Sequence, residues 1–322
     1  MNSIPNLKRR MRLPVIAAPM FLASGPDLVI EACRAGVVGT FPALNLRSTE
    51  DLAVQLSTIS DSLGPQDASF GVNLIVRRTN QRFEADLAEI VRQEVPIVIT
   101  SLGAVREVVE AIHGYGGLVF HDVINRRHAE NAAAAGVDGI IAVAAGAGGH
   151  GGTTSPFALL SEVRQVFDGA VILAGAVSTG ADVAAACAMG ADFAYMGTRF
   201  LATKESMASA AHKRMILDGG SASVIYTPVF SGVAANYLAE SIRGAGFDPE
   251  SLGGAIHRDP DGPKAWRDIW SAGQGIAAIH DEPGVAELCA RLREEFETAI
   301  ARLETSPFRG ARPARRMERT DR

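Results

Sequence analysis

The amino-acid sequence predicts a (β/α)8 TIM barrel followed by a C-terminal, mostly helical lobe that covers the substrate. Two observations point to this α/β fold. Short apolar segments recur through the first 200 residues, and each is followed by a polar segment compatible with a helix. The repeat length of about 20–30 residues fits eight βα units. A doubly wound open sheet shows the same alternation and is the alternative fold.

The expected strands are near-continuous apolar runs rather than strict alternations of apolar and polar residues. This pattern is typical of parallel strands that are covered on both faces. The runs cover residues 15–18, 37–41, 70–74, 97–101, 117–121, 139–144, 170–174 and 193–196.

The segments between these runs predict the outer helices of the barrel. They cover residues 27–35, 49–63, 80–93, 105–113, 126–135, 156–167 and 180–189. Ser155 followed by Pro156 is a clear helix start, because serine caps a helix N-terminus and proline suits its first position.

The pattern changes after Arg199, which suggests a division of the chain. Residues 1–204 are expected to form the barrel domain, and residues 205–305 a helical lobe over its mouth. Helices are expected at 206–217 and 284–303, with a Gly- and Ser-rich segment between them. Residues 306–322 are expected to be a flexible basic tail.

Composition excludes several classes of protein. The net charge of −5 gives no electrostatic case for binding nucleic acid or an anionic membrane. Three widely spaced cysteines show no metal-ligand spacing and favour a reducing, cytoplasmic compartment. The basic residues before the apolar run 13–23 imitate a signal peptide. Pro14 and Pro19 interrupt that run, however, so we interpret it as the first strand.

The loop after the sixth predicted strand is the most unusual segment of the chain. Residues 146–154 include five glycines around His150 and contain the pattern GxGxxG. A dinucleotide-binding loop opens directly into a helix, whereas here the helix signal comes only at Ser155. The loop is therefore better suited to close approach of its backbone to a flat ligand.

His150 is the candidate catalytic residue. Histidine exchanges protons near neutral pH, and the active face of a barrel is built from loops that follow the strands. A structural role within its loop is the alternative. His121 beside Asp122 is a second candidate for the barrel mouth, and His212 is interpreted as structural.

The loops after the seventh and eighth predicted strands suggest a phosphate site, which barrels often place there. Ala176, Gly197 and Thr198 could supply backbone N–H donors, and Thr198 adds a hydroxyl. Arg199 could pair with phosphate or with a carboxylate of the scaffold, and the sequence leaves both open.

Several of these segments together resemble the nitronate monooxygenase family, formerly called 2-nitropropane dioxygenases. They are PVIAAPM (14–20), GVNL (71–74), GGHG (148–151), AGA (174–176), GAD (190–192) and MGTRFLAT (196–203). The flavin-dependent enoyl-acyl-carrier-protein reductases share much of this pattern. The resemblance implies an FMN-dependent barrel enzyme.

The resemblance also implies roles for individual residues. Cofactor-binding residues would be Ala18, Pro19, Met20, Asn73, Gly148, Gly149, Ala176, Met196, Gly197 and Thr198, and His150 would be catalytic. The last four cofactor contacts would hold the phosphate end. No metal site is expected. Where many relatives carry Gln and Glu, this chain has Val143 and Gly146, and where some carry Lys it has Asp122.

The implied activity is oxidation of nitronates or nitroalkanes by O2 to a carbonyl product and nitrite. NAD(P)H-dependent reduction of an enoyl thioester is the alternative within the flavin enzymes. A phosphosugar-type isomerase or lyase without flavin, and a binding protein without catalysis, are further alternatives. The expected partners are a small-molecule substrate and O2, with a possible homo-oligomer.

Overall fold

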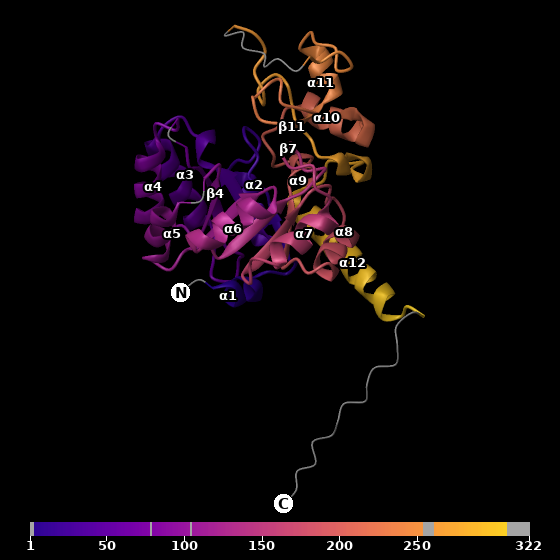
Figure 1. Ribbon diagram of the computed structural model, residues 1–322. Helices are drawn as coiled ribbons and strands as arrows, with labels where there is room; N and C mark the ends of the chain where they lie inside the picture. Colours follow the sequence, from indigo (N-terminus) through magenta and orange to yellow (C-terminus); the bar gives the residue numbers. More distant parts are fainter. Residues whose placement is uncertain (1–2, 78, 104, 254–260, 308–322) are drawn as a thin grey trace, which may run out of the picture.

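The barrel predicted from the sequence is present and closed. The computed structural model describes residues 3–77, 79–103, 105–253 and 261–307. Eight parallel strands follow one another around the barrel (Figure 1). They are β1 (Val15–Ala17), β2 (Val38–Pro42), β3 (Phe70–Ile75), β4 (Ile97–Ser101), β5 (Leu118–Val123), β6 (Gly139–Val143), β8 (Ala170–Ala174) and β9 (Phe193–Met196). Each lies within two residues of its predicted position, and β9 pairs with β1 to close the barrel.

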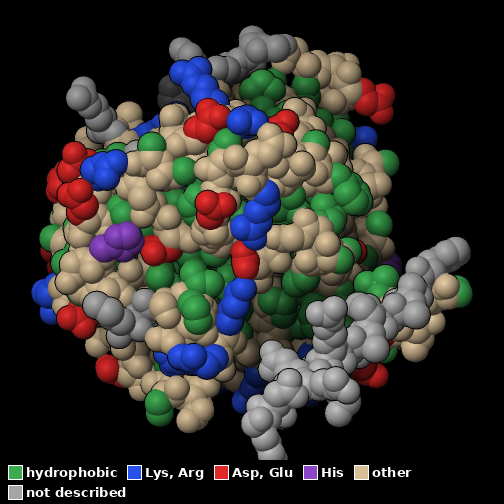
Figure 2. Space-filling model, turned by 60° about the horizontal axis from the view of Figure 1, so that its bottom comes forward, with side chains coloured by type: hydrophobic (Ala, Val, Ile, Leu, Met, Phe, Trp, Pro, Cys, Tyr) green, Lys and Arg blue, Asp and Glu red, His purple; other side chains and the backbone are tan. Residues whose placement is uncertain are grey.

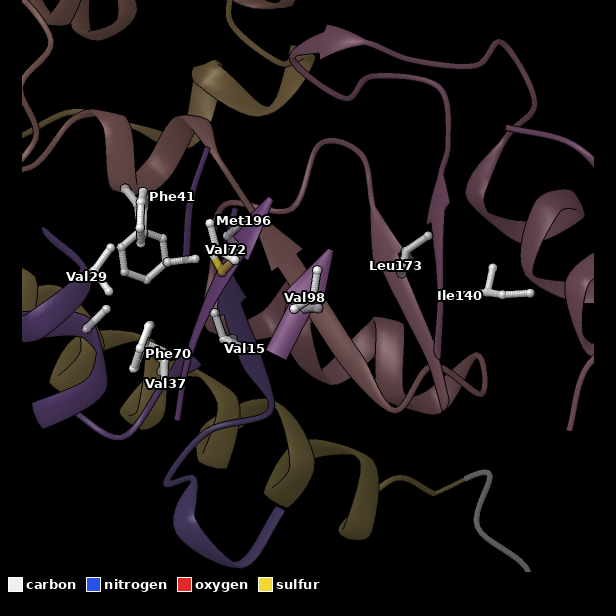
Figure 3. Close-up of a cluster of buried hydrophobic side chains, with 14 of the residues drawn as sticks. Val15, Val29, Val37, Phe41, Phe70, Val72, Val98, Ile140, Leu173 and Met196 are labelled. Carbon is white, nitrogen blue, oxygen red and sulfur yellow. The ribbon is translucent and has the colours of Figure 1, made fainter. Parts of the chain in front are cut away.

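Side chains alternate along each strand between two apolar cores. Inward-facing residues such as Ile16, Ile99 and Phe193 fill the barrel. Outward-facing residues of the same strands, such as Val15, Val98 and Met196, belong to the larger core between barrel and helices (Figure 3). Because both faces of the sheet are covered, the strands read as continuous apolar runs.

Seven outer helices lie where the sequence predicts them. They are α2 (Pro26–Arg34), α3 (Thr49–Ser62), α4 (Phe83–Arg92), α5 (Arg106–His113), α6 (Arg126–Ala135), α7 (Pro156–Arg164) and α8 (Gly180–Ala188). Ser155 caps α7, since its hydroxyl accepts the N–H of Ala158. Thr179 and Asp182 form a reciprocal capping box at the start of α8.

The long helix α12 (Val285–Glu304) completes the outer ring of helices. The expected lobe included this segment, but its apolar residues Leu288 and Leu292 join the core around the barrel. The helix packs against α8 and α2 and runs down the outside of the barrel (Figure 1). An amphipathic pattern shows that a helix has a buried face without showing which element covers it.

The segment between β9 and α12 starts and ends at the same place on the barrel. The Lys204 N–H donates to the Pro283 carbonyl oxygen at 3.1 Å. The carboxylate of Glu205 accepts the Val285 N–H, the first of α12, at 3.0 Å. Residues 205–284 therefore leave the barrel and return beside their starting point.

This segment lies at one end of the barrel (Figure 1). Its helices are α10 (Ala210–Asp218) and α11 (Ala239–Gly244), with short 3-10 turns η2 (Ser221–Ser223) and η3 (Gln274–Ala278). It also contains β10 (Val224–Thr227) and β11 (Ala235–Leu238), which the sequence did not suggest. β11 pairs with β10 on one side and with β7 (Gly149–His150) of the glycine-rich loop on the other, forming a three-stranded antiparallel sheet.

A short N-terminal helix, α1 (Ile4–Arg10), lies at the opposite end of the barrel (Figure 1). Its Leu7 is buried in the interior core with Ile16 and Ile97. Asp192 holds the helix in place: its carboxylate accepts from Lys8 Nζ at 2.6 Å, Arg164 Nη2 at 2.7 Å and the Val171 N–H at 2.9 Å.

Replacing Asp192 with asparagine is expected to lower the free energy of unfolding by about 1–3 kcal/mol, as for loss of hydrogen bonds to charged partners. Burial alone would raise the pKa of Asp192, but the bonds from Lys8, Val171 and Arg164 outweigh it and lower the pKa. The stabilisation is therefore present above about pH 4 and is lost as the pH falls further. Urea unfolding between pH 7 and pH 3.5 measures it, with the exposed Asp168→Asn as control. An equal loss in both variants would contradict this role.

Charges are mixed on the end of the molecule that carries α1. Figure 2 shows Lys and Arg side chains there lying among Asp and Glu side chains. In the part of the chain that the structure describes, no helix combines the length and the apolar composition needed to cross a membrane. Cys33, Cys187 and Cys289 are free thiols. The predicted tail lies outside the described residues from position 308 onward.

Candidate active site

A cavity of about 840 Å³ opens where the barrel strands end, beneath the segment 205–284. This volume is typical of sites for small molecules and cofactors. Its walls come from the ends of all eight barrel strands and the loops that follow them, and from residues above the mouth that include His212, Val233, Ala234, Trp266, Ser271 and Gly273. The carboxyl ends of the strands are the active face of such barrels.

The cavity brings together most of the residues predicted for the site. Ala18, Pro19, Met20, Asn73, Gly148, Gly149, His150, Ala176, Gly197 and Thr198 all line it. The Met196 side chain does not, because it faces outward from β9 into the core around the barrel (Figure 3). Its carbonyl oxygen accepts the Ala18 N–H at 2.9 Å, so Met196 supports the cavity only through its backbone.

The glycine-rich loop is held between the barrel and the covering segment. Its residues 149–150 pair with β11, and Asn236 Nδ2 donates to the Ala147 carbonyl oxygen at 2.6 Å. Gly146 has φ +88°, and a Cβ there would lie 3.2 Å from Gln274 Oε1. A Glu at this position is thus disfavoured by both backbone and packing. The loop runs into β7 and not into a helix, so its GxGxxG pattern is no dinucleotide-binding turn.

His150 lies at the rim of the cavity, in contact with two residues of the covering segment. Its Nε2 lies 3.1 Å from Ser231 Oγ, and its ring meets Trp266 edge-on with centroids 5.2 Å apart. The Ser231 hydroxyl donates to the Val233 carbonyl oxygen at 2.8 Å, so its oxygen accepts a proton from Nε2. This assigns the hydrogen to Nε2 and leaves the lone pair on Nδ1.

The electrostatic surroundings keep His150 neutral at physiological pH. Its pKa lies below the ordinary value, first because of partial burial and second because of the positive charge of Arg77. A neutral imidazole with one free lone pair can accept a proton or a hydrogen bond.

The predicted phosphate end is only partly free to bind a ligand. The Ala176 N–H donates to the Gly146 carbonyl oxygen at 3.3 Å. Ala176 itself has a positive φ of +53°. Thr198 Oγ1 accepts the Gly273 N–H at 2.8 Å, which leaves the hydroxyl proton for another acceptor. Arg199 is buried and pairs with Asp281 at 3.0 Å, so it anchors the scaffold.

Polar side chains from three adjacent strands line the floor of the cavity. Asn73 Nδ2 donates to Ser101 Oγ at 2.7 Å, and Ser101 Oγ donates to Asp122 Oδ2 at 2.5 Å. Burial raises the pKa of Asp122 to about 6, although the bond from Ser101 opposes this rise. Tyr195 lines the same floor from β9.

Of the three further histidines that line the cavity, His121 and His212 are held by local contacts. His121 Nδ1 lies 2.7 Å from Thr100 Oγ1, and burial lowers the pKa of His121 to about 4. His212 stacks on Trp270 and has Nε2 2.9 Å from the Ser271 carbonyl oxygen. Among the described residues, no three His, Cys, Asp or Glu side chains are grouped to hold a metal ion.

The fold and the cavity define a barrel enzyme whose site is completed by a covering segment. Residues 67–245, more than half of the chain, match the family model described as nitronate monooxygenase. The chain therefore belongs to the nitronate monooxygenase family, as the sequence motifs predicted. This membership makes it an oxidoreductase enzyme.

Individual relatives include one that carries the family's name and one that is named as a dehydrogenase. A nitronate monooxygenase of Paraburkholderia phytofirmans is 27% identical over 345 residues, covering 90% of this chain and 94% of that protein. A (3aS,4S,5R,7aS)-5-hydroxy-7a-methyl-1-oxo-octahydro-1H-indene-4-carboxyl-CoA dehydrogenase of Rhodococcus jostii is 31% identical over 193 residues. That match covers 60% of this chain and only 53% of the dehydrogenase, about half of its length.

Two solved structures share the architecture. Nitroalkane oxidase from Streptomyces ansochromogenes superimposes with a TM-score of 0.78 at 26% identity, covering 92% of this chain and 99% of that one. FabK from Thermotoga maritima has a TM-score of 0.78 at 24% identity, covering 93% and 97%, and shows the same fold.

Proposed function

We propose that the protein is an FMN-dependent monooxygenase that oxidises nitronates or nitroalkanes with O2 to a carbonyl product and nitrite. The observation that carries the proposal is the placement of His150 and the predicted flavin-contacting residues around one cavity in a member of this family. When bound, FMN would supply the electron acceptor for the substrate.

The residues present fit a flat, phosphorylated cofactor. The cavity is lined mainly by apolar groups and by glycines, and a Cβ on Gly197 would project between Ala18 and Met20. Ala18, Pro19 and Met20 would contact the ring system, with Gly148 and Gly149 passing close to it. Asn73 would offer its oxygen Oδ1, because its Nδ2 is engaged by Ser101 and the Ile99 carbonyl.

The phosphate end would lie where β9 leads into the short helix α9 (Thr198–Leu201). Barrels of this class often bind phosphate at the start of such a short extra helix, where backbone N–H groups are unpaired. Gly197 and the Thr198 hydroxyl would provide donors. Ala176 would shape the turn, since its N–H already has an acceptor.

We also propose that residues 205–284 act as the cover of the site. Val233, Ala234 and Trp266 project from this segment onto the cavity, where they would exclude water and contact the substrate. The described residues of the proposed barrel domain, which spans positions 1–204, would form the supporting scaffold together with α12.

His150 would act through Nδ1. On a neutral nitroalkane this nitrogen would remove a proton from carbon, and on a nitronate the imidazole would orient the anion. Ser231 is a positioning residue, because its bond to Nε2 selects the tautomer that leaves Nδ1 unprotonated.

Replacing Ser231 with alanine is expected to lower kcat for a neutral nitroalkane about tenfold, as the loss of one orienting hydrogen bond implies. Binding of FMN should not change. Threonine at position 231 keeps the hydroxyl and should restore kcat. Steady-state kinetics with nitroethane measure the effect. Equal rates in the alanine and threonine variants would show that Ser231 does not position the imidazole.

One anaerobic experiment separates the competing reactions. FMN-loaded protein is mixed with nitronate or with NADPH, and flavin absorbance is followed by stopped flow. Rapid bleaching by nitronate with little by NADPH is the expected result. Rapid bleaching by NADPH would instead favour reduction of an enoyl thioester. Protein that takes up no FMN would refute both flavin reactions and leave the phosphosugar-type isomerase or lyase.

A further inference from the structure

The floor of the cavity holds a buried hydroxyl group that lacks a partner. Tyr195 faces into the barrel from β9, and its hydroxyl makes no hydrogen bond with the described residues. An unpaired buried hydroxyl is costly, so such a group normally meets a ligand or water. Because Tyr195 lines the cavity, its hydroxyl would donate to an oxygen or nitrogen acceptor on the molecule that fills the cavity.

Asp122 lies close enough to Tyr195 for its charge to act on the phenol. It faces the same cavity from β5 and receives one hydrogen bond, from Ser101 to Oδ2. Among the described residues, its other oxygen, Oδ1, accepts none. The titratable groups that share the cavity wall are Tyr195 and the histidines 121, 128, 150 and 212, and no described lysine or arginine lines it.

A ligand that fills the cavity would remove the remaining water from Asp122. An ionised carboxylate sealed in an apolar cavity without a cation is strongly disfavoured and takes up a proton instead. The protonated carboxyl group then becomes a hydrogen-bond donor. A tyrosine and a neutral carboxylic acid in apolar surroundings are an effective pair of donors for an oxygen that carries negative charge.

We propose that Tyr195 and protonated Asp122 form a two-donor site for a carbonyl or anionic oxygen of the ligand in this cavity. The proposal rests on the proposed function in placing a planar, oxygen-bearing ligand there. The oxygen could belong to a ring carbonyl of the cofactor or to the substrate, and both share the same chemistry. Asn73 and Ser101 position the carboxyl group.

The site has a defined pH dependence. Burial raises the pKa of Asp122 to about 6 before any ligand binds, so the carboxyl group is mostly ionised at pH 7. Binding that requires the protonated form then takes up one proton. Its dissociation constant should rise towards tenfold per pH unit above about pH 6 and stay level below it.

The test uses Asp122→Asn, which keeps a donor but does not titrate, and Tyr195→Phe. Tyr115→Phe is the control, because its hydroxyl bonds to the Val95 carbonyl outside the cavity. In the first arm, FMN is titrated into each protein between pH 5.5 and 8.5. In the second arm, FMN-loaded protein is titrated with 4-nitrophenol, whose phenolate is read by absorbance, and the affinity at each pH is expressed per concentration of free phenolate.

The expected result is a loss of about tenfold in affinity for Tyr195→Phe in one arm, with Asp122→Asn removing the pH dependence in that arm. An effect on FMN identifies the cofactor oxygen, and an effect on 4-nitrophenol identifies the substrate oxygen. Unchanged affinities in both arms overturn the proposal. A wild-type protein that binds no FMN contradicts the proposed function instead. In that case, titration of the protein without FMN with 4-nitrophenol tests whether Tyr195 and Asp122 form the two-donor site.

Discussion

Replacing His150 with alanine is expected to lower kcat/KM for a neutral nitroalkane about 10²–10⁴-fold while FMN stays bound, the usual loss when a general base is removed. The same variant should lose only about tenfold with a preformed nitronate, since that substrate needs orientation and not deprotonation. Comparing nitroethane with its nitronate therefore separates the two roles of the imidazole.

The pH profile gives an independent readout. Partial burial and Arg77 lower the pKa of His150, so the base form persists below the ordinary histidine value of 6.5. The acid limb for nitroalkane turnover should therefore fall below pH 6.5 in the wild type and be absent in the variant. His113→Ala is the control, because that histidine pairs with Asp138 away from the cavity. Equal losses with both substrates would refute a role in proton removal.

The largest expected effect on stability comes from Gly180, where α8 meets α12. A Cβ at this position would lie 2.0 Å from the Leu292 carbonyl oxygen and 2.5 Å from the Phe296 nitrogen, both backbone atoms of α12. Neither atom can move without shifting the helix. Gly180→Ala should therefore cost about 3 kcal/mol, the upper part of the usual range for overpacking. For a protein of 322 residues that is a fall of roughly 4–5 °C in Tm.

Thermal unfolding followed by circular dichroism measures this effect. Gly220→Ala is the matched control, since nothing lies within 4 Å of a Cβ there and its backbone is extended. If Gly180→Ala fails to fold, Glu295→Gln gives a milder test, because the Glu295 carboxylate accepts the Gly180 N–H at 2.7 Å. A Tm for Gly180→Ala equal to that of Gly220→Ala would contradict close packing of α12.

The barrel could be predicted because its signals are local. Each strand such as Ile97–Ser101 is a short apolar run, and each helix carries its own cap. The three-stranded sheet was missed because β7 has only two residues and pairs with β11 more than 80 positions away. Such pairing leaves no periodic pattern within a short window of sequence.

The candidate site could be predicted in outline for a similar reason. Once a barrel is expected, the loops after its strands must meet at one face, and this placed His150 and Thr198 at the cavity. On β9 the Tyr195 side chain faces inward and the Met196 side chain faces outward, so a contact of Met196 with a ligand would be made through its backbone. The alternation of inward- and outward-facing side chains along β4 would also have indicated Ser101 as a site residue. The places of Trp266 and Ser231 in the site depend on contacts made by the covering segment.

The return of residues 205–284 to their starting point has a consequence for evolution and for engineering. Its two ends are joined by the bond from Lys204 to Pro283, so the segment is an insertion into the barrel and not an appendage. A segment of different length and sequence could be exchanged there without stretching any βα unit. Relatives could thus come to accept different substrates by exchanging the segment that corresponds to residues 205–284, while the barrel residues that line the bottom of the cavity stay the same.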